Sequence, residues 1–126
     1  MKLSDSEWTV MTVIWERSPA SVRDVLETIG AKTDWAYSTV KTILERLVEK
    51  KALRVRKRAN SGLFEPLITR HEARRAAVRS LLERAFDGGI GSLVQHLFVE
   101  EKLSKKDRRQ LTRMLEELER PREKSK

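Results

Sequence analysis

The most constraining feature of the sequence is a change of hydrophobic period near residue 50. Before it, one face of a helix is marked by apolar residues at Val40, Ile43, Leu44, Leu47 and Val48. After it, residues 53–57 (Leu-Arg-Val-Arg-Lys) alternate apolar and cationic side chains with the period of a β-strand. A chain that passes directly from an amphipathic helix into a short basic strand is expected to fold as a small domain of helices with a β-hairpin.

The strand at 53–57 has a candidate partner. Residues 59–62 (Ala-Asn-Ser-Gly) have turn chemistry, and residues 63–67 can return as a second strand. Pro66 cannot donate a hydrogen bond to a ladder, which confines it to an edge and favours a ribbon of two or three strands. We therefore expect a basic hairpin after the helix.

Two further helices are expected before this segment. Apolar residues at helical spacing (Trp8, Met11, Ile14 and Trp15) follow Ser4 and Ser6, either of which can cap a helix. Because both tryptophans fall on this stripe, they are predicted to lie in the core. Ser21 with Asp24 resembles a capping box, and the helix that it opens is predicted to end at Gly30.

The second part of the chain is predicted to be helical. The first helix is expected to begin at a capping box of Thr69 with Glu72 and to end at Gly88-Gly89. The second is expected to run from Ile90 to Phe98. The third is expected to begin at Ser104 with Asp107 and to end at Pro121. Residues 122–126 are expected to be disordered. The predicted organisation is thus a domain of three helices and a hairpin at 1–70 and a helical region at 71–126.

Length and composition exclude several classes of protein. A chain of 126 residues can bury one compact core, or a small domain plus a segment that needs a partner. Without cysteine it has no disulfide framework and no thiolate metal site. No apolar run approaches the roughly 18 residues of a membrane span, and Asp5 falls where a signal peptide is apolar. We expect a cytoplasmic protein without membrane insertion.

The charge distribution indicates a polyanionic partner. The chain holds 27 cations and 19 anions, and 27 − 19 gives +8; residues 1–70 and 71–126 each contribute +4 (13 − 9 and 14 − 10). Residues 50–58 hold six cations and no anion. Nucleic acid is a better candidate than a membrane surface, and a solvated charge run is the alternative.

No enzyme or cofactor site is predicted. The two histidines, His71 and His96, are 25 residues apart and have no third ligand at motif spacing, so neither a metal nor another cofactor is expected. No nucleophile, base and orienting group occur at usable spacing. Nucleotide-binding and hydrolase fingerprints are also absent from the sequence.

Three helices followed by a basic hairpin are the parts of a winged helix-turn-helix. In that fold the third helix enters the major groove and the hairpin lies over the adjacent backbone. The residues predicted to face DNA from the third helix are Ser38, Thr39, Lys41, Thr42 and Arg46, and those predicted to bind phosphates from the hairpin are Arg54, Arg56, Lys57 and Arg58. Glu45 is discordant because phosphates repel a carboxylate, and its role stays open.

The sequence resembles the penicillinase-repressor and methicillin-resistance-regulator family of bacterial transcriptional repressors. The resemblance rests on residues 34–48 (Asp-Trp-Ala-Tyr-Ser-Thr-Val-Lys-Thr-Ile-Leu-Glu-Arg-Leu-Val), on 7–11 and 14–15 before them, and on Phe64-Glu65-Pro66-Leu67 after them. It extends through 80–82, 92–94 and 100–104. It implies a homodimeric repressor of a palindromic operator on double-stranded DNA, released when a membrane sensor protease triggers cleavage in the dimerisation region.

The chain departs from the family pattern in three ways. Family members have glycine after the third helix, where this chain has Lys51, so a non-glycine residue is expected to cap that helix at some cost. The family's cleavage site aligns with His96-Leu97, although members are cut between asparagine and phenylalanine. Some relatives sense copper through a cysteine pair, which this chain lacks.

The helical region is predicted to join two protomers. The apolar faces of its predicted helices are too few to form a separate core in a region of about 55 residues. The apolar residues on these faces are Leu93, Val94, Leu97, Leu111, Met114, Leu115 and Leu118. Two alternatives to a specific repressor stay open: a general chromosome-binding architectural protein of the nucleoid, and a winged-helix module that binds proteins.

Overall fold

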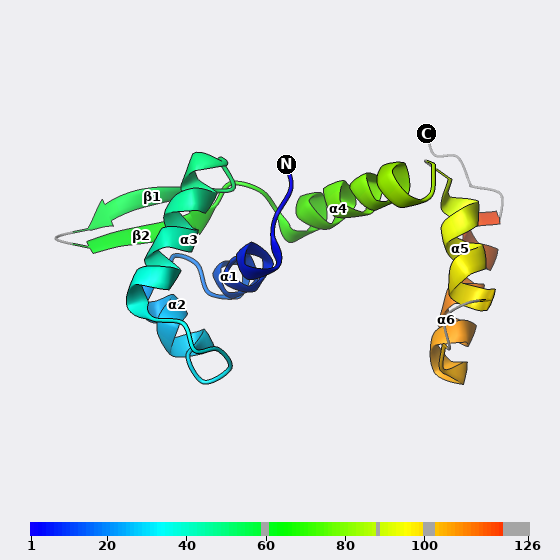
Figure 1. Ribbon diagram of the computed structural model, residues 1–126, viewed down its shortest axis with the longest axis horizontal. Helices are drawn as coiled ribbons and strands as arrows, with labels where there is room; N and C mark the ends of the chain where they lie inside the picture. Colours follow the sequence, from blue (N-terminus) through cyan, green and yellow to red (C-terminus); the bar gives the residue numbers. More distant parts are fainter. Residues whose placement is uncertain (59–60, 88, 100–102, 120–126) are drawn as a thin grey trace. The chain divides into compact units, whose positions relative to one another are not determined.

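The described residues of the chain form three helices, a hairpin and three more helices. The structure, a computed structural model, describes residues 1–58, 61–87, 89–99 and 103–119 (Figure 1). Its elements are α1 (Asp5–Glu16), α2 (Val22–Ile29), α3 (Tyr37–Glu49), β1 (Leu53–Arg58), β2 (Ser61–Pro66), α4 (Arg70–Ala85), α5 (Ile90–Val99) and α6 (Lys105–Glu119). This order confirms the predicted fold class. Contacts divide the chain into two units, Met1–Ser80 and Leu81–Lys126.

Side chains satisfy free backbone N–H groups at the helix starts. Of the two serines that could cap α1, Ser4 does so, because its Oγ accepts a hydrogen bond from the Glu7 N–H at 3.3 Å. The other predicted caps form as Ser21–Asp24 in α2, Thr69–Glu72 in α4 and Ser104–Asp107 in α6. Each such cap stabilises its helix by roughly 1 kcal/mol.

The core of the first unit lies between its N-terminal helices and the hairpin. One cluster of buried side chains comprises Val10, Met11, Val13, Ile14, Ala20, Val22, Val25, Ile29, Val40, Ile43, Leu44, Leu47, Ala52, Leu53 and Phe64. The central element is α3, which contacts α1, α2 and β1. Burial of its apolar stripe fixes which of its residues face solvent.

The tryptophans of α1 lie at the edge of this core, and the prediction that both are core residues is wrong. Both are only partly buried. Trp15 packs against the cluster, donates its Nε1–H to the Ile68 carbonyl at 2.9 Å, and contacts Trp8 at a ring separation of 5.9 Å. An indole N–H needs a polar partner when buried, which favours the boundary over the interior.

The passage from α3 into β1 depends on a lysine in the left-handed region. Lys51 has φ = 67°, which confirms that a non-glycine residue ends this helix. A left-handed residue with a side chain costs about 1–2 kcal/mol. The next residue is held firmly, since the Ala52 N–H donates to Leu47 O at 2.9 Å and its carbonyl accepts from the Leu67 N–H at 2.8 Å.

The hairpin is a two-stranded antiparallel ribbon with one added bridge. Leu53 pairs with Pro66 at its base, and Arg58 pairs with Ser61 at its far end. Ala20 bridges to Phe64 through two backbone hydrogen bonds of 3.1 and 2.7 Å. The ribbon therefore agrees with the position predicted from Pro66. Of the predicted turn, residues 59–60 lie outside the described residues and 61–62 belong to β2.

The second unit leaves the described apolar side chains of α5 and α6 at least partly exposed. Neither α5 nor the described part of α6 contains a buried residue. Ile90, Val99 and Met114 are 59%, 68% and 49% exposed. Within the described ranges, every helix is too short or too polar to cross a membrane. Pro121 and residues 122–126, predicted as a helix stop and a disordered end, lie outside the described residues.

Candidate nucleic-acid interface

The polar face of α3 is open to solvent along its whole length. The five residues predicted to face DNA, Ser38, Thr39, Lys41, Thr42 and Arg46, are all exposed, and so is Glu45. Because a helix turns about 100° per residue, Ser38 points directly away from Leu47, which is fully buried. The core thus presents this face outward.

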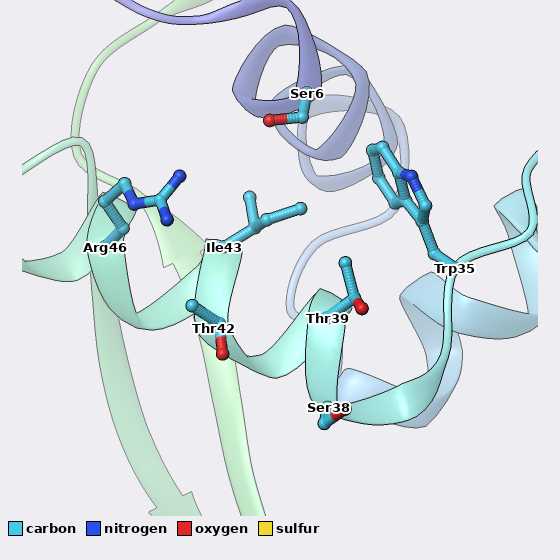
Figure 2. A pocket seen from close by; sticks show the side chains of 7 residues that line it. All are labelled: Ser6, Trp35, Ser38, Thr39, Thr42, Ile43 and Arg46. Carbon is cyan, nitrogen blue, oxygen red and sulfur yellow. The ribbon is translucent and has the colours of Figure 1, made fainter.

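A groove of about 400 Å³ lies along one flank of this face, between α3 and α1. Its lining includes Ser6 of α1, Trp35 before α3, and Thr39, Thr42 and Arg46 of α3. Figure 2 shows that Arg46 and Trp35 are directed toward α1, whereas Ser38 and the Thr42 hydroxyl point away from it. A guanidinium and a serine hydroxyl on this flank suit the oxygens of a phosphate.

A second groove, of about 490 Å³, lies along the opposite flank. It is bounded by Arg23 of α2, by Tyr37, Lys41 and Glu45 of α3, and by Gly62 of β2. The structure therefore separates the two predicted cations of the helix: Lys41 faces the hairpin flank and Arg46 faces the α1 flank. Two cationic borders with hydroxyls between them match the arrangement of phosphates around base edges in a DNA groove.

The hairpin cations divide between two faces of the ribbon. Arg54 and Arg56 lie on one face, where both bind Glu65 at 2.8 and 2.7 Å. Lys57 lies on the other face, opposite Gly62, and is exposed. Since Gly62 lines the second groove, Lys57 is the described hairpin cation on the side of the groove. The side chain of Arg58, the fourth predicted phosphate ligand, lies outside the described residues.

A buried carboxylate ties the end of α3 to the start of α1. Glu7 is fully buried, and its Oε1 accepts from Lys50 Nζ at 2.6 Å and from the Ser4 N–H at 2.8 Å. Lys50 also donates to the Lys2 carbonyl at 2.7 Å. Burial acts to raise the pKa of Glu7, but the hydrogen bonds from Lys50 and Ser4 outweigh it and lower the pKa below its ordinary value.

Sequence reasoning did not identify Glu7 and Lys50 as partners. The S-x-x-E spacing of Ser4 and Glu7 was a signal for the capping part of this arrangement. No spacing links residues 7 and 50, so the ion pair follows only from the packing of α1 against α3. Oε2 of Glu7 has no hydrogen-bond partner among the described residues.

The residues predicted for dimerisation lie on α5 and α6. Leu93, Val94, Leu97 and Leu111 are partly buried, and Met114 is exposed; the side chains of Leu115 and Leu118 lie outside the described residues. The aligned cleavage position, His96-Leu97, falls inside α5, where the His96 ring lies 6.0 Å from the ring of Phe86.

Comparisons with known proteins agree with this geometry. The family model described as Penicillinase repressor matches residues 3–117. The "Penicillinase repressor" of Bacillus licheniformis is 29% identical over 116 residues, which cover 92% of this chain and 91% of that protein. The solved DNA-binding domain of the repressor BlaI matches with a TM-score of 0.51 and 32% identity, over 55% of this chain and 84% of that one.

A second solved structure describes a complex with DNA. It is the Bacillus licheniformis BlaI monomeric form with the blaP half-operator, and it matches with a TM-score of 0.50 and 30% identity. The match covers 57% of this chain and 88% of that chain. These matches establish the first unit as a winged helix-turn-helix.

Proposed function

Because the chain belongs to the penicillinase repressor family, which is a family of transcriptional repressors and not of enzymes, we propose that it is a dimeric repressor that binds a palindromic operator. It acts on the chromosome in the cytoplasm. The observation that carries the proposal is the outward face of α3, with hydroxyls at its centre and Lys41 and Arg46 on its two flanks.

The proposed division of roles follows from this geometry. Ser38, Thr39 and Thr42 contact base edges, and Lys41 and Arg46, one on each flank, reach base edges as well as the phosphates at the groove borders. The hairpin cations Arg54, Arg56, Lys57 and Arg58 bind phosphates, and they add affinity without sequence information. The neutralisation of Arg54 and Arg56 by Glu65 makes Lys57 the stronger phosphate ligand among the described hairpin cations.

A second copy of the chain is proposed to cover the apolar residues of α5 and α6. A two-fold dimer buries the same stripe on both protomers, which accounts for a unit whose described helices bury none of their own residues. It also places two recognition helices in successive major grooves, about 34–36 Å apart or a multiple of that spacing.

Release of the operator is proposed to follow cleavage at His96-Leu97, triggered indirectly by a membrane sensor protease. Proteolysis favours exposed, unstructured chain, whereas this bond lies within α5. The proposed order is therefore local opening of α5, then cleavage, then dissociation of the dimer. Intact mass spectrometry of the protein from induced cells would give a fragment ending at His96 if this order holds, and only full-length chain if it does not.

The central experiment is selection of bound sites from a random DNA pool. The expected product is a palindrome whose half-sites are about one helical turn, or a multiple of it, apart. Equal binding of unrelated DNA would indicate an architectural protein, and failure to bind any fragment would indicate a protein-binding module. Either result contradicts the proposal.

Matched variants test the assigned roles. Thr42→Ala and Lys41→Ala are expected to reduce discrimination between the selected site and random DNA. Arg58→Ala is expected to weaken binding to the selected site and to random DNA equally. It is also expected to reduce the slope of log affinity against log salt concentration by about 1. Binding titrations at several salt concentrations measure both quantities, and an Arg58→Ala variant that changes only specificity would contradict the assignment.

A further inference from the structure

Glu45 is a carboxylate beside the hydroxyl-bearing and cationic side chains of the outward face of α3. It is exposed, and it makes no ion pair within the part of the chain that the structure describes. Four other carboxylates of the first unit are neutralised by cations: Glu7 by Lys50, Glu16 by Arg70, Asp24 by Arg17, and Glu65 by Arg54 and Arg56. Asp5, Glu27, Asp34 and Glu49, like Glu45, make no ion pair among the described residues, so it is the position of Glu45 on the outward face of α3 that distinguishes it.

Nearby cations do not account for Glu45. Lys41 precedes it by four residues, which is the less favourable order for a helical ion pair, and no such pair forms. Arg23 lines the same groove from α2 but makes no ion pair with Glu45. The carboxylate is therefore left available to a ligand.

The position of Glu45 is the centre of the exposed face of α3. At about 100° per residue it lies about 20° from Ser38 and about 60° from Thr42, on the side opposite buried Leu47. Lys41 and Arg46 lie farther round, one on each flank. In Figure 2, Ser38 and the Thr42 hydroxyl point away from the flank toward which Arg46 is directed.

This position also falls within the reach of one groove. Ser38 to Glu45 spans about 10.5 Å along the axis, compared with a major-groove width of about 12 Å. Glu49 lies on the same side of the helix but about 6 Å farther along, at the last residue of α3. Ser38 to Glu49 spans about 16.5 Å, which exceeds the width of the groove, so Glu45 is included and Glu49 is not.

The geometry points to Glu45 as a specificity-determining residue that accepts a hydrogen bond from the exocyclic amino group of a cytosine. This inference rests on the proposed DNA binding. At the centre of the groove a carboxylate is farther from the phosphates than at its borders, so repulsion is smallest there. Among base edges in the major groove, the cytosine N4 amino group is the donor that glutamate characteristically recognises.

The test compares sites selected from a random DNA pool by the full-length wild type, Glu45→Ala, Glu45→Gln and a control, Glu49→Ala. Wild type is expected to prefer cytosine at one position of each half-site by about 5- to 100-fold. Glu45→Ala loses the preference at that position alone. Glu45→Gln shifts it toward adenine, because glutamine pairs with the adenine N6 and N7 atoms.

Glu49→Ala separates base recognition from net charge. Both alanine variants remove one negative charge from exposed positions of α3, so both are expected to bind random DNA more tightly by a similar small factor. Only Glu45→Ala changes the selected bases. Circular dichroism of each variant establishes that α3 is retained, as expected for alanine in a helix.

Two results overturn the inference, and they are distinguishable. If wild type selects a defined site and Glu45→Ala selects the same site at every position, Glu45 does not read a base while the proposed function stands. If wild type selects no site, the proposed function fails and the inference fails with it.

Discussion

The two units of the chain use similar apolar stripes in opposite ways. In the first unit the stripes of α1, α2 and α3 meet in one buried cluster that the hairpin completes. In the second unit the described residues of α5 and α6 bury nothing completely, and Ile90 and Val99 are more than half exposed. Residues 1–70 and 71–126 have the same net charge of +4, so net charge does not reveal this difference in burial.

The difference teaches that an amphipathic pattern specifies a helix and its buried face, but not the partner of that face. A stripe is satisfied within the chain only if other elements reach it. Residues 1–70 supply three helices and a hairpin for mutual burial, whereas the second unit has too few elements. Stability of the first unit is therefore expected to be independent of protein concentration, and that of the second to depend on it.

The largest expected effect comes from the centre of the first unit. Leu44 is fully buried in α3, so Leu44→Ala removes buried methyl groups and leaves a cavity, at a cost of about 2–5 kcal/mol in the free energy of unfolding. Urea unfolding at two protein concentrations would give the same loss. The matched Leu97→Ala change in α5 is expected to cost less at low concentration; an equal, concentration-independent loss would break the comparison.

A charge on the stripe of α5 tests its proposed burial in a dimer. Leu97→Asp places a carboxylate in an apolar interface and is expected to raise the dimer dissociation constant by about 30-fold or more, or roughly 2 kcal/mol. Sedimentation over a concentration series measures this constant. Gln95→Asp adds the same charge at an exposed position of α5 and is the control. A wild-type chain that is monomeric at micromolar concentration would contradict the dimer.

The buried ion pair offers a test within the first unit. Lys50→Met leaves the Glu7 carboxylate buried without its cation and is expected to destabilise the fold by about 2 kcal/mol, less than for a wholly buried pair because Lys50 is partly exposed. Lys41→Met on the same helix removes a cation that has no ion-pair partner among the described residues and is expected to have little effect. Similar losses for both would show that the pair contributes nothing.

The Glu7–Lys50 pair makes the stability of the first unit depend on pH. Since folding lowers the pKa of Glu7, its contribution is fully present above the ordinary glutamate pKa of about 4.3 and is lost as the pH falls through the lower pKa of the folded state. The stability difference between wild type and Glu7→Gln, measured by urea unfolding between pH 7 and pH 3, is therefore expected to shrink at the acid end. A constant difference would mean that the pKa of Glu7 does not change on folding.

The smallest expected effect distinguishes the two faces of the hairpin. Lys57→Ala is expected to weaken DNA binding by about 0.5–1 kcal/mol and to reduce the salt slope by about 0.9. Arg54→Ala is expected to do less, because Glu65 already neutralises part of its charge. Salt-dependent titrations on random DNA measure both slopes, and a larger effect of Arg54→Ala would reverse the assignment of faces.

Much of the first unit could be predicted because its signals are local. Caps at Ser21 and Thr69, the stripe of α3 and the alternation at 53–57 involve residues within one or two turns of each other. The error at Trp8 and Trp15 has a different origin. Apolar spacing marked the correct side of α1, but the need of the Trp15 indole for the Ile68 carbonyl was not visible in that spacing.

The candidate site was predictable as a set of residues but not as an arrangement. Helical spacing alone sorted the α3 residues into inward and outward groups, since each position follows from the last by a fixed rotation. The pairing of Glu65 with Arg54 and Arg56 needed the register of the hairpin. The separation of Lys57 from those arginines follows from the same register.

The sequence by itself determined the element order, the buried face of each N-terminal helix and the cationic hairpin, because these depend on residue type and on periods of 3.6 and 2. The tertiary structure decided which charges are neutralised and which are left for a ligand. Glu7 meets Lys50 across 43 positions of the chain, whereas Glu45, four residues from Lys41, has no ion-pair partner among the described residues. Ion pairs depend on distances in space that only packing sets, so the chemistry of this surface emerged from the fold.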